Sequence, residues 1–414
     1  MQTEIITIGD EILIGQITDT NSAFIAAQMN ANGFNIVQIT SIHDNKQQII
    51  SALDTAFLRA DVVLITGGIG PTKDDITKQT LAEYFGMRLV FSDLVYQNIL
   101  ELFKTRPFVM NELTRQQANV PENAEIIQNR LGTAPIMWFD RDDGKVAVSM
   151  PGVPYEMKTA LNTDIIPRLH QRFDIQAIVT KNVLVAGIPE SQLAIKIADW
   201  ENALPANIHL AYLPQYGIVK LRLSGASDNA LSLEFIINQQ IASLAEILGK
   251  SIIAFEDILL EQIVSTLLRR NGQTLAVAES CTGGNIAHHL TLLAGSSDIF
   301  SGGVIAYSNK LKINLLGVNS ADIETFGAVS RQVVEQMAQG VCRITNSDFG
   351  IATSGIAGPS GGTSEKPVGT VWIAVCSKNK TVSQVFQFGN FREQNIERAT
   401  QSAFLMLKNF IEEN

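Results

Sequence analysis

A short turn in the second half of the chain carries side chains that could perform nucleophilic chemistry. It lies between an apolar run typical of a strand, 274–277, and a helix-type pattern, 286–293, and reads Ala278-Glu279-Ser280-Cys281-Thr282-Gly283-Gly284. The serine, cysteine and threonine would sit at the strand tip, and the two glycines would let the backbone approach a ligand. Free N–H groups at the helix start could hold a phosphate or a developing oxyanion. An ordinary βα loop with a helix N-cap explains the same residues without chemistry.

A second candidate site lies in a glycine-rich stretch that follows the buried strand pattern at 62–65. Its glycines would expose N–H groups to a phosphate and its threonines would add hydroxyls, so the predicted phosphate-binding residues are Thr66, Gly67, Gly68, Gly70 and Thr72. Carboxylates at the edge of an anion site could hold a divalent cation, and the candidates are Asp10, Asp44, Asp74 and Asp75. Alternatively, one of the last two caps the helix predicted at 76–85.

Composition limits the class of protein. The chain has 414 residues, enough for two or three domains, and its 46% hydrophobic and 17% charged residues favour full cores over disorder. A formal charge of −10 leaves no basic surface for nucleic acid. Three cysteines without a CxxC pair argue against a disulfide framework or a zinc site. No apolar run approaches ~18 residues and no leader pattern precedes the first strand, so we expect a cytoplasmic protein with no membrane partner.

The order of strand and helix patterns predicts an α/β protein in three parts. In residues 1–170, strands alternate with helices, which predicts a βαβ sheet that binds ligands beyond the carboxyl ends of its strands. Residues 171–254 predict a small α+β unit that acts as a spacer or a dimerisation unit. Residues 255–414 contain the serine turn and further strand and helix patterns, which predict a second α/β domain.

The motif order resembles that of the competence/damage-inducible protein A (CinA) family. In the C-terminal part, the serine turn is followed by motifs similar to those of the family's nicotinamide-nucleotide amidase domain, at 295–297, 302–312, 327–330, 354–362 and 366–371. The first part is similar to its molybdopterin-binding-like domain, through motifs at 9–15, 19–21, 66–77, 129–135 and 151–157. The middle part is similar to its KH-like domain. The Gly-x-x-Gly clamp of a nucleic-acid-binding KH module is not evident, so RNA binding is not expected.

The resemblance implies that Ser280 is the nucleophile and that Tyr307 and Lys312 are its catalytic partners. A lysine ordinarily titrates near ~10.4, so burial or a cationic neighbour must lower its pKa before it can act as a base near neutrality. Without the family pattern, Tyr307 would be interpreted as a strand-end core residue and Lys312 as a solvated helix lysine. Cys281 is intrinsically the better nucleophile when ionised, and the helix start would favour its thiolate. Thr282 could also serve, bind phosphate or cap the helix.

Substrate contacts are expected in the serine turn, in a glycine-rich loop at 354–362 and in the last helix. The loop offers a second backbone cradle, and Arg398 matches a family arginine expected to meet a phosphate. Arg392 and Arg398 could instead be exposed surface charges. The predicted substrate-binding residues are Cys281, Thr282, Gly283, Gly284, Ser354, Gly355, Gly358 and Arg398.

The resemblance implies a homodimeric hydrolase that acts on small-molecule nucleotides. The C-terminal domain would deamidate nicotinamide mononucleotide to nicotinate mononucleotide and ammonia without a cofactor. The N-terminal domain would bind a nucleotide or pterin phosphate and cleave ADP-ribose with a divalent cation. One departure is Ile136, where the family usually has glycine. Two alternatives remain open: a non-catalytic partner protein of competence or DNA-damage responses, and an enzyme with only the pyrophosphatase activity.

Overall fold

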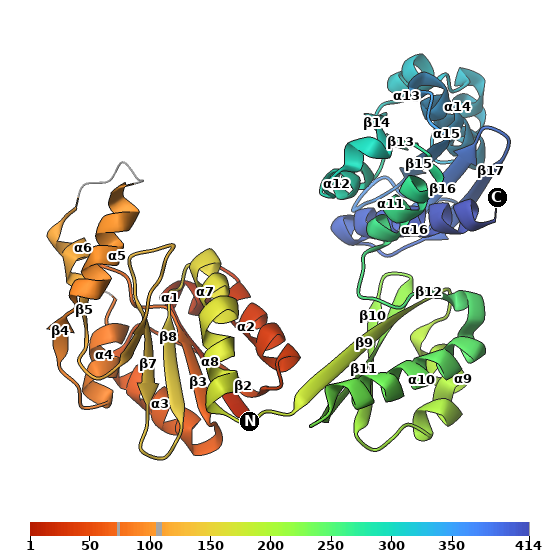
Figure 1. Ribbon diagram of the computed structural model, residues 1–414. Helices are drawn as coiled ribbons and strands as arrows, with labels where there is room; N and C mark the ends of the chain where they lie inside the picture. Colours follow the sequence, from red (N-terminus) through yellow and green to blue (C-terminus); the bar gives the residue numbers. More distant parts are fainter. Residues whose placement is uncertain (73–74, 105–109, 414) are drawn as a thin grey trace. The chain divides into compact units, whose positions relative to one another are not determined.

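Runs of β-branched residues form the central strands of the N-terminal domain, which is built on a mixed sheet of order β2-β1-β3-β8-β7-β6 (Figure 1). Its parallel strands are β1 (Gln2–Ile8), β2 (Asn35–Ile42), β3 (Val62–Thr66) and β8 (Val146–Met150). Two antiparallel strands, β7 (Ile136–Asp140) and β6 (Glu125–Ile127), complete the sheet. The predicted buried strand at 62–65 and the alternation of strands with helices are therefore confirmed, whereas the antiparallel edge was not anticipated.

Alternate residues of β3 face two separate cores, as expected for a strand covered on both sides. Val62 and Leu64 pack with α2 (Thr20–Ala31), α7 (Pro154–Ala160) and α8 (Ile166–Arg172). Val63 and Ile65 pack with α3 (Lys46–Arg59) and α4 (Thr77–Tyr84). The remaining elements are α1 (Asp10–Leu13), β4 (Leu89–Phe91), α5 (Asp93–Lys104), α6 (Glu112–Gln116), β5 (Asn119–Pro121) and the π-helical segment η1 (Leu161–Ile165).

The middle part contains a four-stranded sheet of order β10-β11-β9-β12 with two helices. Its elements are β9 (Ala177–Ala186), α9 (Glu190–Asn202), β10 (Ile208–Gln215), β11 (Ile218–Ser227), α10 (Ala230–Leu248), η2 (Gly249–Ser251) and β12 (Ile252–Ala254). The predicted α+β character of this part is confirmed.

The C-terminal domain is a five-stranded sheet of order β14-β13-β15-β16-β17. β13 (Leu275–Glu279) lies between the parallel strands β14 (Phe300–Ile305) and β15 (Phe349–Gly355), and β16 (Thr370–Ser377) and β17 (Thr381–Gln387) extend the sheet antiparallel. One core lies between the sheet and α11 (Leu260–Asn271), α12 (Asn285–Thr291) and α16 (Arg392–Glu412). The other lies beneath α13 (Asn309–Leu316) and α15 (Arg331–Thr345). Short elements are η3 (Ser296–Asp298) and α14 (Ser320–Phe326).

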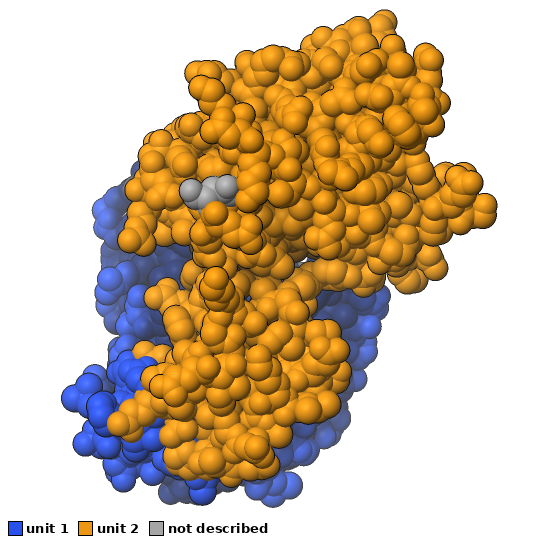
Figure 2. Space-filling view, turned by 90° about the vertical axis from the view of Figure 1, so that its right-hand side faces the viewer, with its two compact units in different colours: residues 1–180, 206–208, 224–238 blue, residues 181–205, 209–223, 239–414 orange. Residues whose placement is uncertain are grey.

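The structure describes residues 1–72, 75–104 and 110–413, and these fall into two compact units. One unit comprises 1–180, 206–208 and 224–238, and the other 181–205, 209–223 and 239–414 (Figure 2). The division passes through the sheet of the middle part, and the predicted boundaries at 170 and 254 stay predictions. None of the described helices combines the length and the apolar character that a bilayer span requires.

A buried carboxylate fixes the junction between β13 and α12. Glu279 is the last residue of β13 and is 1% exposed. Its Oε2 accepts hydrogen bonds from the N–H groups of Gly284 (2.9 Å) and Ile286 (3.2 Å), and its Oε1 accepts one from Ala287 (2.9 Å). The carboxylate thus pairs with the positive end of the helix and satisfies N–H groups that would otherwise be unpaired.

We predict that Glu279→Gln lowers the free energy of unfolding by about 1–3 kcal/mol, because the neutral amide accepts fewer and weaker hydrogen bonds from the helix start. Denaturant unfolding measures the change. Glu393→Gln, at an exposed position in the first turn of α16, is the matched control and should stay within about 0.5 kcal/mol of the wild type. Equal stability of Glu279→Gln and wild type would contradict the assignment.

Candidate functional site

Three parallel strands bring the C-terminal site together at one edge of the sheet. Ser280 is the first residue after β13, Tyr307 is the second residue after β14, and Ser354 lies at the end of β15. Here the surface is hollowed into a cavity of about 240 Å³, which we call the serine cavity. It is lined by Ser280, Cys281, Tyr307, Asn309, Lys312, Ala328, Val329, Ser354, Gly355, Ala357 and Arg392.

Lys312 is a buried amine directed at the serine. The residue is 1% exposed, and its Nζ lies 3.1 Å from Ser280 Oγ and 2.7 Å from the carbonyl oxygen of Ala306. Burial lowers its pKa below the ordinary value of 10.5. Its position in the first turns of α13 also disfavours the positive charge, because the helix start is the positive end of the dipole. The structure therefore meets the requirement set by the sequence: the amine is neither solvated nor out of reach of Ser280.

Tyr307 and Arg392 meet at the mouth of the serine cavity. Tyr307 is 61% exposed, and its phenol oxygen accepts a hydrogen bond of 3.0 Å from Arg392 Nη2. Arg392 Nη1 donates to the carbonyl oxygen of Gly358 (2.9 Å). Tyr307 is therefore no core residue, and the arginine that reaches this site is Arg392.

Arg398 lies elsewhere, contrary to the expectation that it meets a substrate phosphate. Its guanidinium carbon lies 4.4 Å from the centroid of the Tyr216 ring, and it is not among the residues that line the serine cavity. The sequence placed both arginines on the last helix but could not show that the first one turns toward Ser280. The signal that could have favoured Arg392 is its position as the first residue of that helix, directly after the loop that follows β17.

Cys281 is not an ionised rival of the serine. Its thiol is buried, and burial raises its pKa to about 12, which overturns the expectation that the helix start favours a thiolate. Thr282 is buried as well, and its Oγ1 lies 2.7 Å from Thr353 Oγ1 in the core, so it does not line the cavity. Ser280 is the one hydroxyl of the turn that faces Lys312.

The N–H groups at the start of α12 are not free, which corrects a second expectation. Those of Gly284, Ile286 and Ala287 donate to Glu279, so they cannot also hold an oxyanion or a phosphate. The N–H groups of Cys281 and Thr282 donate to no other residue in the described part of the chain. Of these two residues only Cys281 lines the serine cavity, so its N–H group is the donor that the turn leaves available for an oxyanion.

The predicted substrate-binding residues divide into two groups. Cys281, Ser354 and Gly355 line the serine cavity, although Ser354 Oγ already donates to the carbonyl oxygen of Ala328 (2.6 Å). Residues that do not line it are Thr282, Gly283, Gly284, Gly358 and Arg398. Asn309, Ala328 and Val329 also line the cavity. They lie within the motifs at 302–312 and 327–330, but no contact with a substrate was predicted for them.

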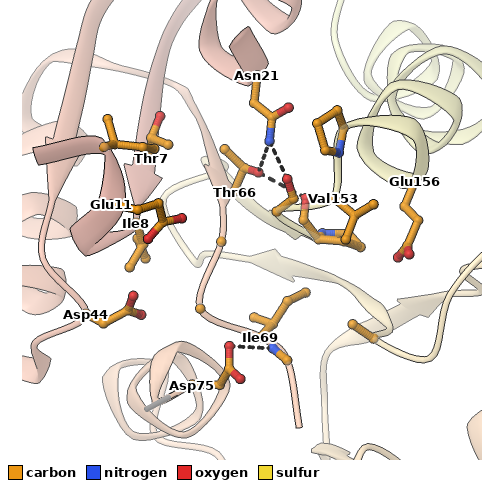
Figure 3. A pocket seen from close by; sticks show the side chains of 18 of the residues that line it. Thr7, Ile8, Glu11, Asn21, Asp44, Thr66, Ile69, Asp75, Val153 and Glu156 are labelled. Carbon is orange, nitrogen blue, oxygen red and sulfur yellow. Dashed lines mark hydrogen bonds between the residues drawn. The ribbon is translucent and has the colours of Figure 1, made fainter. Parts of the chain in front are cut away.

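The N-terminal candidate site is a cavity of about 450 Å³ at the carboxyl ends of β1, β3 and β8, which we call the phosphate-loop cavity (Figure 3). Thr66, Gly67, Gly68 and Gly70 line it, whereas Thr72 does not. Gly67 and Gly68 have φ values of 107° and 64°, which favour glycine, and a side chain on Gly67 would collide with the carbonyl oxygen of Ile8. The cavity also contains Asn21, which donates to the carbonyl oxygen of Gly152 (2.7 Å).

The four predicted metal ligands do not form one cluster among the described residues. Asp10 lies outside the cavity and pairs with His43 Nδ1 at 2.8 Å. Asp75 accepts hydrogen bonds from the N–H groups of Gly70 (2.8 Å) and Thr72 (2.9 Å), so it stabilises the glycine loop. Asp44 lines the cavity, and Asp74 lies outside the described residues. Because no three metal-binding side chains come together in the described chain, we derive no step through a cation.

Three family profiles match successive parts of the chain. "Probable molybdopterin binding domain" matches residues 4–171, "Damage-inducible protein CinA KH domain" matches 180–254, and "CinA C-terminal domain" matches 257–411. These matches agree with the three kinds of domain expected from the sequence.

Two known proteins are similar to this chain over nearly its whole length, and a solved structure is similar to about a third of it. A CinA-like protein of Cytophaga hutchinsonii is 46% identical over 98% of this chain and 96% of its own length, and one of Flavobacterium psychrophilum is 43% identical over 98% of each. Among solved structures, the competence/damage inducible protein CihA from Agrobacterium tumefaciens is 38% identical over 37% of this chain and 93% of its own, with a TM-score of 0.36. Because the proteins of Cytophaga hutchinsonii and Flavobacterium psychrophilum match this chain almost from end to end, the chain belongs to the CinA family.

Proposed function

We propose that the C-terminal domain is an amidase that hydrolyses nicotinamide mononucleotide to nicotinate mononucleotide and ammonia. The observation that carries this proposal is the buried amine of Lys312, 3.1 Å from Ser280 Oγ. A lysine with a lowered pKa can take the proton of a serine hydroxyl, and Ser-Lys pairs are a known variant of nucleophilic catalysis. The choice of a nicotinamide nucleotide as substrate rests on the family resemblance.

The reaction requires two acyl transfers at the same serine. Ser280 Oγ attacks the carboxamide carbon while its proton passes to Lys312 Nζ, and the resulting oxyanion can accept from the N–H group of Cys281. Collapse breaks the C–N bond, and the protonated lysine gives its proton to the leaving ammonia. A water molecule then attacks the ester carbon while Lys312 takes its proton. The bond between that carbon and Ser280 Oγ breaks, Lys312 returns the proton to Oγ, and the acid product leaves as a carboxylate with loss of its own proton to solvent.

Arg392 supports a phosphorylated substrate. Its guanidinium lies at the cavity and donates to Tyr307 and to a backbone carbonyl, both of which are neutral acceptors. Among the described residues it forms no ion pair with a carboxylate, so its charge remains available for an anion. A fixed arginine at the rim suits a phosphate, because the guanidinium can donate two hydrogen bonds to it.

We also propose that the N-terminal domain binds the phosphate groups of a nucleotide or pterin and cleaves ADP-ribose when a divalent cation is supplied. The glycine loop at 67–70 supports the phosphate part, since its backbone turns with positive φ around a cavity large enough for a nucleotide. The cytoplasmic location and the homodimer stay predictions from the sequence.

Ser280→Ala should abolish ammonia release from nicotinamide mononucleotide, with a loss of roughly three orders of magnitude or more, because the attacking atom is removed. Cys281→Ala should keep most of the activity, since that thiol is buried and protonated. A coupled ammonia assay measures both variants. If Cys281→Ala were inactive and Ser280→Ala active, the assignment of Ser280 Oγ as the nucleophile would be wrong.

The pH dependence of kcat/KM should follow the ionisation of Lys312. Its neutral form is the base, so kcat/KM should rise with pH through the lowered pKa, with a midpoint below 10.5. Lys312→Arg should be inactive at all pH values, because a guanidinium stays protonated, whereas Lys310→Arg, at an exposed position in the same helix, should match the wild type.

The same lowered pKa makes a second measurement informative. The unfolded chain binds the lysine proton more tightly than the folded one, so the free energy of unfolding should rise with pH between the lowered pKa and 10.5. The rise should be smaller in Lys312→Met. Identical pH profiles of stability for this variant and the wild type would contradict the burial of a titrating amine.

Two full-length variants separate the two proposed activities and their alternatives. Gly68→Ala should impair ADP-ribose cleavage assayed with added Mg²⁺, because its Cβ would lie 2.1 Å from Thr77 Oγ1 at a positive φ, and it should leave ammonia release intact. Ser280→Ala should show the reverse pattern. A wild-type chain that cleaves only ADP-ribose would support the pyrophosphatase alternative, and one with neither activity would support a binding protein.

A further inference from the structure

Two cysteine side chains of the C-terminal domain lie in contact, although they are far apart in the sequence. Cys342 is in α15 and Cys376 is in β16, 34 residues further on, and their Sγ atoms are 3.4 Å from each other. Both are free thiols. Neither lines the serine cavity or the phosphate-loop cavity, and neither has a part in the reactions proposed above. The sequence did not predict this pair, because the two residues belong to no CxxC motif.

A glycine allows the two sulfurs to meet. Gly350 of β15 is the Cα partner of Cys376 in the pairing of β15 with β16. A Cβ on Gly350 would lie 2.6 Å from the carbonyl oxygen of Ala338, so the backbone of α15 packs directly against the strand here. The same Cβ would lie 2.7 Å from Cys342 Sγ and 3.1 Å from Cys376 Sγ. Any larger residue would therefore push the helix from the sheet and crowd both sulfurs.

The two thiols differ in exposure and in acidity. Cys376 is completely buried, whereas Cys342 is partly exposed, so a solute reaches Cys342 first. A thiolate at Cys342 accepts a hydrogen bond from the Cys376 thiol, which lowers the pKa of Cys342 and raises that of Cys376. The thiolate is the reactive form of cysteine. Cys342 is thus suited to react first, and Cys376 is held ready to attack the product.

We propose that Cys342 and Cys376 form a reversible modification site, at which a hydroperoxide converts the two thiols into a disulfide between α15 and the sheet. The Cys342 thiolate attacks one oxygen of the hydroperoxide, the O–O bond breaks, and the leaving oxygen takes up the proton that the thiol lost. Cys376 Sγ then attacks the sulfur of the resulting sulfenic acid, the S–O bond breaks, and water leaves with the Cys376 proton. The hydroperoxide gains two electrons, and the two thiols lose them.

The disulfide would connect two elements that are otherwise held only by packing in this core. Cys376 and Cys342 lie among apolar side chains such as Val341. A link between them closes a loop of 34 residues, which restricts the unfolded chain and so favours the folded one. In a reducing compartment such links are usually transient and redox-sensing. The site goes beyond the proposed activities, because it requires neither Ser280 nor a nucleotide.

Micromolar hydrogen peroxide added to the folded full-length protein tests the site, with peptide mapping by mass spectrometry without reduction. A pair of peptides joined through Cys342 and Cys376 should form with the loss of two hydrogen atoms, and dithiothreitol should release it. The link should form at least tenfold faster in the folded protein than in urea, because the fold holds the sulfurs 3.4 Å apart. Cys281→Ala is the matched control and should form the link as the wild type does.

Thermal unfolding after peroxide treatment separates the link from other oxidation. The midpoint of the wild type should rise by roughly 5 °C and return after dithiothreitol. Cys342→Ala and Cys376→Ala should show no such rise, although their methionines are exposed to the same oxidant. The proposal would be overturned by a sulfinic acid at Cys342 without a link, by a disulfide through Cys281 or between two chains, or by equal rates in the folded and unfolded protein. An unchanged midpoint of the linked wild type would contradict the connection of α15 to the sheet.

Discussion

The burial of one amine without an acidic partner is the constraint on which the C-terminal site depends. Lys312 is almost completely covered, and its hydrogen bonds go to a hydroxyl and a carbonyl oxygen. Had a carboxylate been placed beside it, the charged form would be favoured and the amine would lose its use as a base. The site therefore requires a helix start, a strand end and a glycine-containing turn to shield the amine from water while leaving Ser280 open to the cavity.

The acid nearest in sequence to Ser280 is kept away from this amine by its own partners. Glu279 is as deeply buried as Lys312, yet three N–H groups of the turn and of α12 surround its carboxylate. Its negative charge is stabilised by the helix and not by the lysine. The same hydrogen bonds fix the conformation of the turn that carries Ser280. The carboxylate of Glu279 therefore helps to position the nucleophile without contacting Lys312 itself.

Local patterns predicted several strands and helices because their cause is local: the β-branched run of β3, the apolar run of β13 and the periodic apolar residues of α12. Ser280, Tyr307 and Lys312 were selected by the family resemblance, and the structure brings Lys312 within 3.1 Å of Ser280 because α13 begins beside the strand ends that carry Ser280 and Tyr307. Sequence reasoning failed for Cys281 and for the N–H groups of α12, since burial and the direction of the Glu279 side chain are properties of the assembled domain. The family resemblance favoured Arg398, but Arg392 is the arginine that lines the serine cavity, and this too is a property of the assembled domain.

Glycines at the two sites show why a sequence pattern alone does not define a site. In the phosphate loop, Gly68 has a φ of 64° and an added Cβ would lie 2.1 Å from Thr77 Oγ1, so both conformation and close packing exclude a side chain. In the serine turn, Gly283 has the same φ of 64°, but nothing lies within 4 Å of an added Cβ. At this position glycine is favoured only by the backbone conformation of the turn, and not by close packing against another group. Two similar glycine pairs thus perform different tasks, and only the neighbours supplied by distant parts of the chain distinguish them.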